Sequence, residues 1–281
     1  METGPLVSVD WLSQRLDDPD LRVVDATWYM PAEQRPGLDE FRKGHIPGAV
    51  FFDIDQIADR EVDLPHMAPR PEVFAQAASA LGLSPAHKIV VYDGHGIFSS
   101  PRVWWTLRLM GFETVAVLDG GLKAWQAAGM PLASGDAEPV PAPAFARYRP
   151  HLVRGLDDVR QALGDSGLQI LDARPAARFL GQAPEPRPGL RGGHMPGACN
   201  LPWNAVVGPD GALRSPEELR GAFVAAGINI DQPVITTCGS GVSAAVLVLA
   251  LARLGVEDVP IYDGSWSEWG GRADTPVATG S

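Results

Sequence analysis

Cysteine is scarce in this sequence of 281 residues, which holds only Cys199 and Cys238. Two cysteines cannot form a disulfide framework, so a reducing compartment, the cytoplasm, is the expected location. Long apolar runs are also missing, since the longest, Ala244–Ala252, is far shorter than the roughly 20 residues that span a bilayer. The N-terminus has neither a basic start nor a long apolar stretch, and we expect no secretory signal and no membrane association.

Positive charge is in short supply. Lys and Arg number 23 against 34 Asp and Glu, a net charge of −11. An acidic chain repels phosphate backbones, and no local basic patch is visible, so we expect no nucleic-acid partner. Cysteine and histidine do not occur at zinc-ligand spacing, and we expect neither a metal nor a cofactor. The hydrophobic share of 45% and charged share of 20% are typical of a folded protein.

The sequence repeats itself at offsets of 144–149 residues, too long a period for a solenoid. The paired motifs are Val23–Ala26 with Ile170–Ala173, Gly44–Ala49 with Gly193–Ala198, Asp119–Gly121 with Asp263–Ser265, and Trp125 with Trp269. We therefore expect two domains, residues 1–135 and 150–281, joined by a proline-rich linker over 136–149. No feature defines the oligomeric state, and a monomer is the simplest expectation.

Short apolar runs alternate with helical patterns in both copies. Expected strands are 22–26, 49–52, 89–92, 115–118, 169–173, 199–201, 234–237 and 259–262, and expected helices are 71–81, 101–110, 216–226 and 242–254. This alternation predicts an α/β fold in which each domain is a parallel sheet with helices on both faces. Ligands of such sheets bind outside the carboxyl ends of the strands.

A duplicated chain separates structural from chemical residues. His45 and His194 occupy the same Gly-His-x-Pro-Gly-Ala turn in both copies, which indicates a structural role, as for Asp25, Asp172, Trp125 and Trp269. The clearest difference follows the third long strand of each copy. There the second copy has Cys238, where the first has Asp93, and the glycine spacing is the same.

The position of Cys238 favours a reactive thiolate. Gly239 and Gly241 allow a tight curl, and a helix is expected to begin near Val242, so backbone N–H groups can surround an anion. The hydroxyls of Ser240 and Ser243 add donors, and such surroundings favour the thiolate, which is the nucleophilic form. An inert buried cysteine at a strand end remains an alternative.

Two other interpretations of this loop are weak. Gly239, Gly241 and Ala244 match a dinucleotide-binding fingerprint, but too few residues follow to build that domain. A cysteine phosphatase requires arginine where this sequence has Ala244, to hold phosphate bidentately.

Taken together, these motifs resemble the rhodanese superfamily in its tandem-domain form, and more narrowly its mercaptopyruvate class. The resemblance covers nearly the whole chain and includes 51–55, 100–105, 172–174, 238–244 and 262–269. It implies two rhodanese-like domains, the first an inactive copy with Asp93 in place of the cysteine. Thiosulfate-using members carry basic side chains where this chain has Gly239 and Ser240, so the resemblance implies 3-mercaptopyruvate as the sulfur donor.

The implied reaction is a sulfur transfer that passes through a Cys238 persulfide. Pyruvate leaves, and an acceptor thiol such as thioredoxin or glutathione, or cyanide in an assay, takes the outer sulfur. A thiosulfate sulfurtransferase and a non-catalytic persulfide carrier remain the alternatives.

The resemblance also implies roles for residues outside the loop. Arg178 and Arg187 would bind the substrate carboxylate and carbonyl, His66 would lie at the substrate, and Asp55 would join Ser240 and Cys238 in catalysis. The loop residues Gly239, Gly241, Val242 and Ser243 would contact the substrate. From the residues alone, the two arginines could equally be solvated, Asp55 a loop or helix cap, and His66 an ordinary loop histidine.

Overall fold

The computed structural model describes residues 4–165 and 167–280 and divides the chain into two compact units. Unit 1 comprises Met1–Arg60, Ala68–Arg149 and Gly208–Leu213. Unit 2 comprises Glu61–Met67, Pro150–Val207 and Arg214–Ser281. Each unit thus includes a short segment from the other sequence copy, a feature absent from the division of the chain predicted above.

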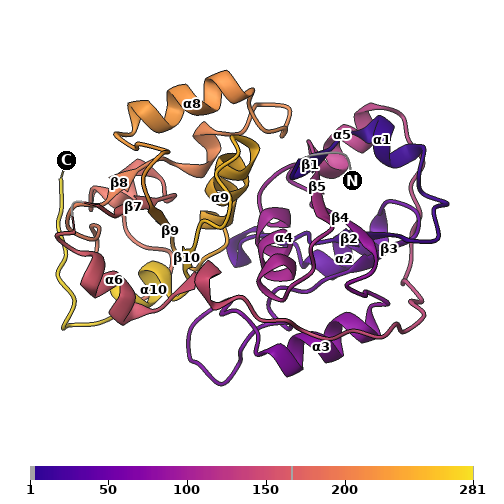
Figure 1. Ribbon diagram of the computed structural model, residues 1–281, viewed down its shortest axis with the longest axis horizontal. Helices are drawn as coiled ribbons and strands as arrows, with labels where there is room; N and C mark the ends of the chain where they lie inside the picture. Colours follow the sequence, from indigo (N-terminus) through magenta and orange to yellow (C-terminus); the bar gives the residue numbers. More distant parts are fainter. Residues whose placement is uncertain (1–3, 166, 281) are drawn as a thin grey trace. The chain divides into compact units, whose positions relative to one another are not determined.

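Unit 1 is built on a five-stranded parallel sheet in the order β1-β5-β4-β2-β3 (Figure 1). Its elements are β1 (Leu6–Val7), α1 (Val9–Ser13), β2 (Leu21–Asp25), α2 (Gly37–Lys43), β3 (Ala49–Phe51), α3 (Pro71–Ala80), β4 (Lys88–Tyr92), α4 (Ser100–Leu109), β5 (Val115–Leu118) and α5 (Gly121–Ala127). Helices α1, α2 and α5 pack on one face through Leu12, Phe41 and Trp125. Ile89 and Val91 point to the opposite face and are fully buried, and α4 packs against β4 and β5.

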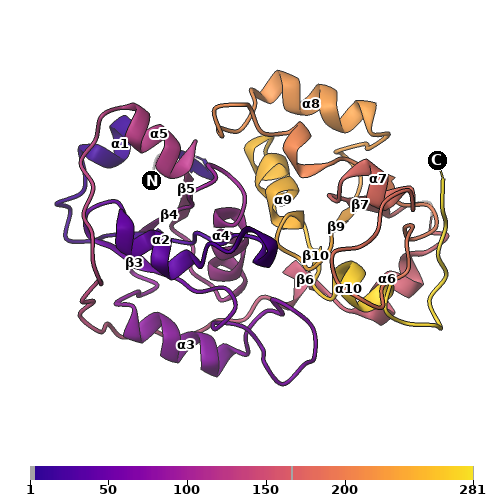
Figure 2. The same cartoon turned by 180° about the vertical axis from the view of Figure 1, so that it is seen from behind.

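Unit 2 repeats this plan, with the strand order β6-β10-β9-β7-β8. Its elements are β6 (Val153–Arg154), α6 (Leu156–Ala162), β7 (Gln169–Asp172), α7 (Ala176–Phe179), β8 (Cys199–Asn200), α8 (Pro216–Ala225), β9 (Val234–Thr237), α9 (Ala244–Arg253), β10 (Ile261–Tyr262) and α10 (Ser265–Trp269). Helices α6 and α10 lie side by side on one face of the sheet (Figures 1 and 2), where Val159 and Trp269 join the core. Helix α9 packs against β9 and β10.

The identical strand orders confirm the predicted α/β fold of two similar parallel sheets. The eight predicted strands are all present, but β10 lacks the expected residues Val259 and Pro260. Proline has no N–H to donate to a neighbouring strand, although the Pro260 carbonyl still accepts a hydrogen bond from Thr236. Helix α9 begins at Ala244, later than the predicted Val242. Helices such as α1 and α10 are too short for a sequence period to reveal.

The repeated histidines are structural in both units, as the sequence predicted. Nδ1 of His45 lies 2.8 Å from the Phe41 carbonyl, and Nδ1 of His194 lies 2.8 Å from the Phe179 carbonyl. Each imidazole also stacks on the phenyl ring of the same phenylalanine, with centroids 3.9 and 3.8 Å apart. The pairs fix equivalent turns beside each sheet. In the part of the chain that is described, no helix is both long and apolar enough to cross a membrane.

Candidate active site

Cys238 lies directly after β9, at the carboxyl end of the unit 2 sheet, and is 2% exposed. Helix α10 holds the backbone around it. The N–H of Trp266 donates to the Cys238 carbonyl at 2.9 Å, and the N–H and Oγ of Ser267 donate to the Gly239 carbonyl at 2.9 and 2.7 Å. The Cys238 N–H donates to Oγ of Ser265 at 3.3 Å. The carbonyls at the start of the loop are therefore fixed, which fixes the peptide planes that follow.

The next residues curl toward the start of α9. Gly241 has a φ of +78°, in the left-handed region that favours glycine. Val242 is buried and Ser243 is the N-cap of α9. No acceptor among the described residues takes the N–H groups of Ser240, Ser243 or Ala244. These N–H donors lie at the N-terminus of α9, a helix of ten residues, where an anion is stabilised.

The matching loop of unit 1 shows what such a curl binds. Oδ1 of Asp93 accepts the N–H of His95 at 2.8 Å. Oδ2 accepts the N–H groups of Phe98, Ser99 and Ser100 at 2.9, 3.0 and 2.8 Å, and the Ser100 hydroxyl at 2.6 Å. An anionic side chain at the cysteine position is thus enclosed by main-chain donors in unit 1. The same sequence positions follow Cys238 in unit 2, where the side chain is one group shorter.

Ser240 is paired with a histidine from the first sequence copy. Nδ1 of His66 lies 2.9 Å from Oγ of Ser240, within unit 2, and both side chains are buried. His66 has a φ of +59°, an uncommon conformation for a residue with a Cβ. A residue held in such a conformation next to the cysteine loop is positioned by its surroundings rather than by local preference.

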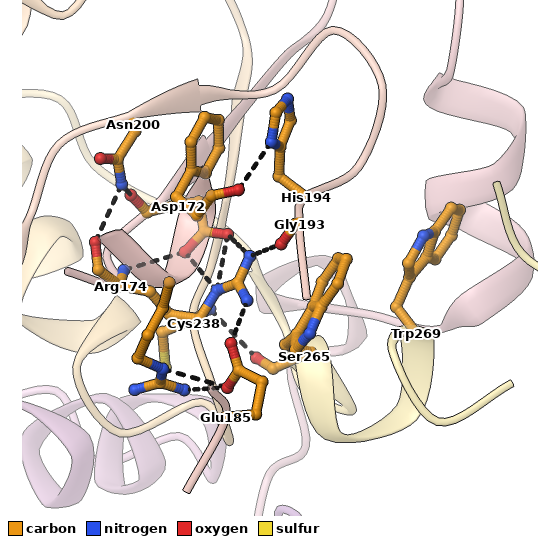
Figure 3. A network of polar contacts seen from close by, with 12 residues as sticks. Asp172, Arg174, Glu185, Gly193, His194, Asn200, Cys238, Ser265 and Trp269 are labelled. Atoms are coloured by element: carbon orange, nitrogen blue, oxygen red, sulfur yellow. Dashed lines mark hydrogen bonds and ion pairs between the residues drawn. The ribbon is translucent and has the colours of Figure 1, made fainter. Parts of the chain in front are cut away.

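Arg178 belongs to a buried ionic network whose members Asp172, Arg174 and Glu185 are labelled in Figure 3. Glu185, whose side chain is 1% exposed, accepts from Nη1 of Arg174 at 2.8 Å and pairs with the Arg178 guanidinium. Nη2 of Arg178 lies 3.2 Å from the point where a Cβ on Gly239 would stand. A side chain at position 239 would therefore crowd this guanidinium.

The most buried part of the network is the ion pair between Arg174 and Asp172. Nε and Nη2 of Arg174 donate to Oδ2 of Asp172 at 2.9 and 2.6 Å, and Nη2 also donates to the Gly193 carbonyl at 2.8 Å. The guanidinium carbon lies 4.1 Å from the ring centroid of Trp266. Burial by itself lowers the pKa of Arg174, but the charges of Asp172 and Glu185 outweigh it, and the pKa is raised. This arginine is a fixed cation that supports Glu185.

The remaining predicted residues are Arg187 and Asp55. Arg187 is half-buried in the segment between Glu185 and Leu190 of unit 2. Asp55 is an exposed residue of unit 1, where Nε1 of Trp28 donates to its Oδ2 at 2.9 Å. The structure therefore brings His66, Ser240 and the Cys238 loop together within unit 2, with Arg178 against Gly239.

Three residues of this site were missed by the sequence reasoning. Glu185 is the hub of the arginine network, and the two serines of α10, Ser265 and Ser267, bond the cysteine loop. A signal existed for the serines, because the first copy has Gly121 and Lys123 at the matching positions. No sequence pattern marks Glu185, since the first copy has no equivalent segment.

Comparison with known proteins identifies the family. The family model for the rhodanese-like domain matches residues 8–128 and 155–272, one match in each sequence copy. The chain belongs to the rhodanese family. Both halves of the chain match, although only the second carries a cysteine in the loop after the central strand.

Curated and solved relatives share this tandem arrangement. This chain is 48% identical to the 3-mercaptopyruvate sulfurtransferase of Escherichia coli K12 over 278 residues, covering 99% of each chain. It is 46% identical to the mitochondrial thiosulfate/3-mercaptopyruvate sulfurtransferase 1 of Arabidopsis thaliana, covering 97% of this chain and 78% of the relative. The crystal structure of SseA from Escherichia coli is 45% identical, with a TM-score of 0.86 over 94% of this chain and 99% of that one.

Proposed function

We propose that this protein is a 3-mercaptopyruvate sulfurtransferase in which Cys238 carries the sulfur. The observation that supports this most is the pair of matching loops. In unit 1 the loop encloses the Asp93 carboxylate, and in unit 2 the loop with the same glycine spacing begins at the buried Cys238 thiol. A frame of N–H donors beside a helix N-terminus stabilises the thiolate that the reaction requires.

The reaction has two displacements at sulfur. The Cys238 thiolate attacks the sulfur of 3-mercaptopyruvate, and the carbon–sulfur bond breaks with its electron pair left on carbon. Pyruvate leaves as its enolate and takes a proton, while Cys238 keeps the sulfur as a persulfide. An acceptor thiolate then attacks the outer sulfur, and the Cys238 thiolate is restored. The acceptor is a small or protein thiol such as glutathione or thioredoxin.

Arginine suits the α-keto acid end of this substrate, because its planar guanidinium binds a carboxylate through two parallel bonds. Arg178 already lies against the cysteine loop and is held by Glu185. We assign Arg178 and Arg187 to the substrate carboxylate and carbonyl. Replacing either arginine with glycine should raise KM for mercaptopyruvate, because the substrate loses about 1.5–3 kcal/mol of binding free energy. An unchanged KM in both variants would remove this assignment.

Proton transfer falls to the buried pair of Ser240 and His66 and to Asp55. The 2.9 Å contact of the His66 imidazole with the Ser240 hydroxyl provides a polar path beside the sulfur. Asp55 is assigned on the family resemblance as the acidic member of this set. The backbone N–H groups of Gly239, Gly241, Val242 and Ser243 complete the surroundings of the substrate.

The donor preference rests on a neutral loop. The two residues that follow Cys238 carry no charge, so thiosulfate would meet no cationic side chain from them. Thiosulfate remains the second candidate donor, because one curated relative is named for both donors and the thiosulfate sulfurtransferase of Cricetulus griseus is 40% identical over 271 residues. Turnover measured with both donors separates the two, and a clear preference for thiosulfate would reverse the assignment.

The decisive experiment follows the sulfur atom. Intact mass spectrometry after addition of mercaptopyruvate without an acceptor should show the gain of one sulfur atom. Cys199→Ser is the matched control, since it removes the other free cysteine, and it should gain the sulfur, whereas Cys238→Ser should not. A carrier that is not an enzyme would show negligible turnover with any small donor. Both cysteines are free, which fits the reducing location, the cytoplasm, that we propose.

A further inference from the structure

The two sequence copies differ at the second residue after a shared aspartate. In unit 2 that residue is Arg174, whose guanidinium makes paired bonds to Asp172 and lies over Trp266. In unit 1 the corresponding residue is Thr27. The backbone is the same in both places: the Thr27 N–H donates to Oδ1 of Asp25 at 2.7 Å, as the Arg174 N–H donates to Oδ1 of Asp172 at 2.9 Å.

Because unit 1 has Thr27 in place of the arginine, its aspartate, Asp25, has no cationic partner at this position. Asp25 is 1% exposed, and no described residue donates to its Oδ2 with ordinary hydrogen-bond geometry, although the hydroxyls of Thr27 and Tyr92 lie close enough to lower the pKa of this carboxyl. The equivalent oxygen of Asp172 accepts two bonds from a guanidinium. Burying a carboxylate oxygen without a partner is costly, so the position of Oδ2 indicates a missing donor.

A cavity of about 240 Å³ stands beside this oxygen, within unit 1. Its lining includes Asp25, Thr27, Gly44, Gly94 and Leu122, which match Asp172, Arg174, Gly193, Gly239 and Trp266 in the sequence of unit 2. The counterpart of Gly44 is thus Gly193, whose carbonyl accepts a bond from the Arg174 guanidinium. The cavity therefore occupies the place that the arginine side chain fills in unit 2.

Charged side chains at the cavity are already matched with one another. Arg35 and Lys43 both pair with Glu40, and the Arg35 guanidinium carbon lies 3.9 Å from the ring centroid of Tyr29. These contacts account for both cations and one carboxylate of the lining. Asp25 is the lining carboxylate that remains without a cation among the described residues.

We propose that this cavity of unit 1 binds the guanidinium group of a small alkylguanidinium compound, which takes the place of the absent arginine side chain. The planar group would make paired bonds to the Asp25 carboxylate, as Arg174 does to Asp172. An ammonium ion cannot reproduce this fork, because its donors are not coplanar. The site is separate from Cys238 and does not depend on sulfur transfer.

Binding of n-butylguanidinium tests the proposal directly. Titration followed by ligand-observed nuclear magnetic resonance should show saturable binding to the wild type, and n-butylammonium should bind more weakly. Asp25→Asn keeps the shape but removes the charge and should weaken n-butylguanidinium binding by at least about tenfold. No saturable binding to the wild type, or equal binding to Asp25→Asn, would overturn the proposal.

A second variant supplies the guanidinium from the chain itself. Thr27→Arg should fill the cavity, abolish n-butylguanidinium binding and raise the Tm of unit 1 above that of Thr27→Met, which has an unbranched side chain without the charge. Both variants lose the 3.0 Å bond from the Gly94 N–H to Oγ1 of Thr27, so this loss cancels between them. In the Asp25→Asn background the advantage of arginine over methionine should vanish. An equal Tm for the arginine and methionine variants with Asp25 present would refute the proposed fit.

Discussion

Neutralising Asp25 should change how the stability of unit 1 depends on pH. Burial raises the pKa of Asp25 from 3.8 to about 6, and the hydroxyl and N–H of Thr27 and the hydroxyl of Tyr92 offset only part of this. The unfolded chain loses this proton near its ordinary pKa, whereas the folded chain keeps it until about pH 6. Stability due to this group is therefore fully present below the unfolded pKa and is lost as the pH rises toward 6.

The magnitude follows from the two pKa values. Each pKa unit corresponds to about 1.4 kcal/mol, so the rise from 3.8 to about 6 represents about 3 kcal/mol of folding free energy. The asparagine of the Asp25→Asn variant cannot titrate, so the stability of the variant relative to the wild type should grow by about 2 kcal/mol between pH 4 and pH 7, because the carboxyl of the unfolded wild type is already partly ionised at pH 4. Other carboxyl groups titrate in both proteins and cancel in this difference.

Hydrogen exchange read by mass spectrometry gives the required local free energies, because it resolves peptides from β2 and β4 of unit 1. Asp172→Asn is the matched change in the other copy. It leaves the Arg174 guanidinium buried with one carboxylate fewer and should destabilise unit 2 by about 3–5 kcal/mol. A difference between Asp25→Asn and wild type that stays constant from pH 4 to pH 7 would refute the reasoning.

Three further outcomes test the active site. Glu185→Gln removes the charge that holds Arg178 and should raise KM for mercaptopyruvate with little change in kcat, whereas Glu218→Gln, in an exposed ion pair, should leave both unchanged. Asp55→Asn should lower kcat while circular dichroism shows an intact fold, and an unaltered kcat would exclude its catalytic role. Iodoacetamide at pH 7 should alkylate Cys238 first, because burial raises the pKa of Cys199 and keeps that thiol protonated. Faster labelling of Cys199 would contradict the proposed thiolate.

Much of the fold could be predicted because the chain contains two versions of the same domain. The recurrence of motifs around Asp25 and Asp172 predicted equivalent sheets, and the strand orders of the two units are identical. The contrast between Asp93 and Cys238 located the loop that differs in chemistry. Both inferences rest on short sequence patterns that determine the local main-chain conformation. Similar patterns in the two copies therefore give similar strands and loops.

Other features depend on contacts between distant parts of the chain. Glu185 becomes the partner of Arg174 and Arg178 only when its loop folds back toward these two residues, and the sequence offers no period or motif for such a loop. The contact between His66 and Ser240 joins residues separated by 174 positions. Sequence spacing carries no information about pairs that tertiary packing creates.

The segment that carries His66 has a consequence for any attempt to divide the protein. A protease cut or a split gene within 136–149 would leave Glu61–Met67 on the N-terminal product, although those residues complete unit 2, and Gly208–Leu213 on the C-terminal product, although they complete unit 1. Each fragment would carry a piece that the other needs. The boundary between the two sequence copies is therefore not the boundary between the two compact units. Separately produced halves should regain a full set of active-site groups only when they are mixed.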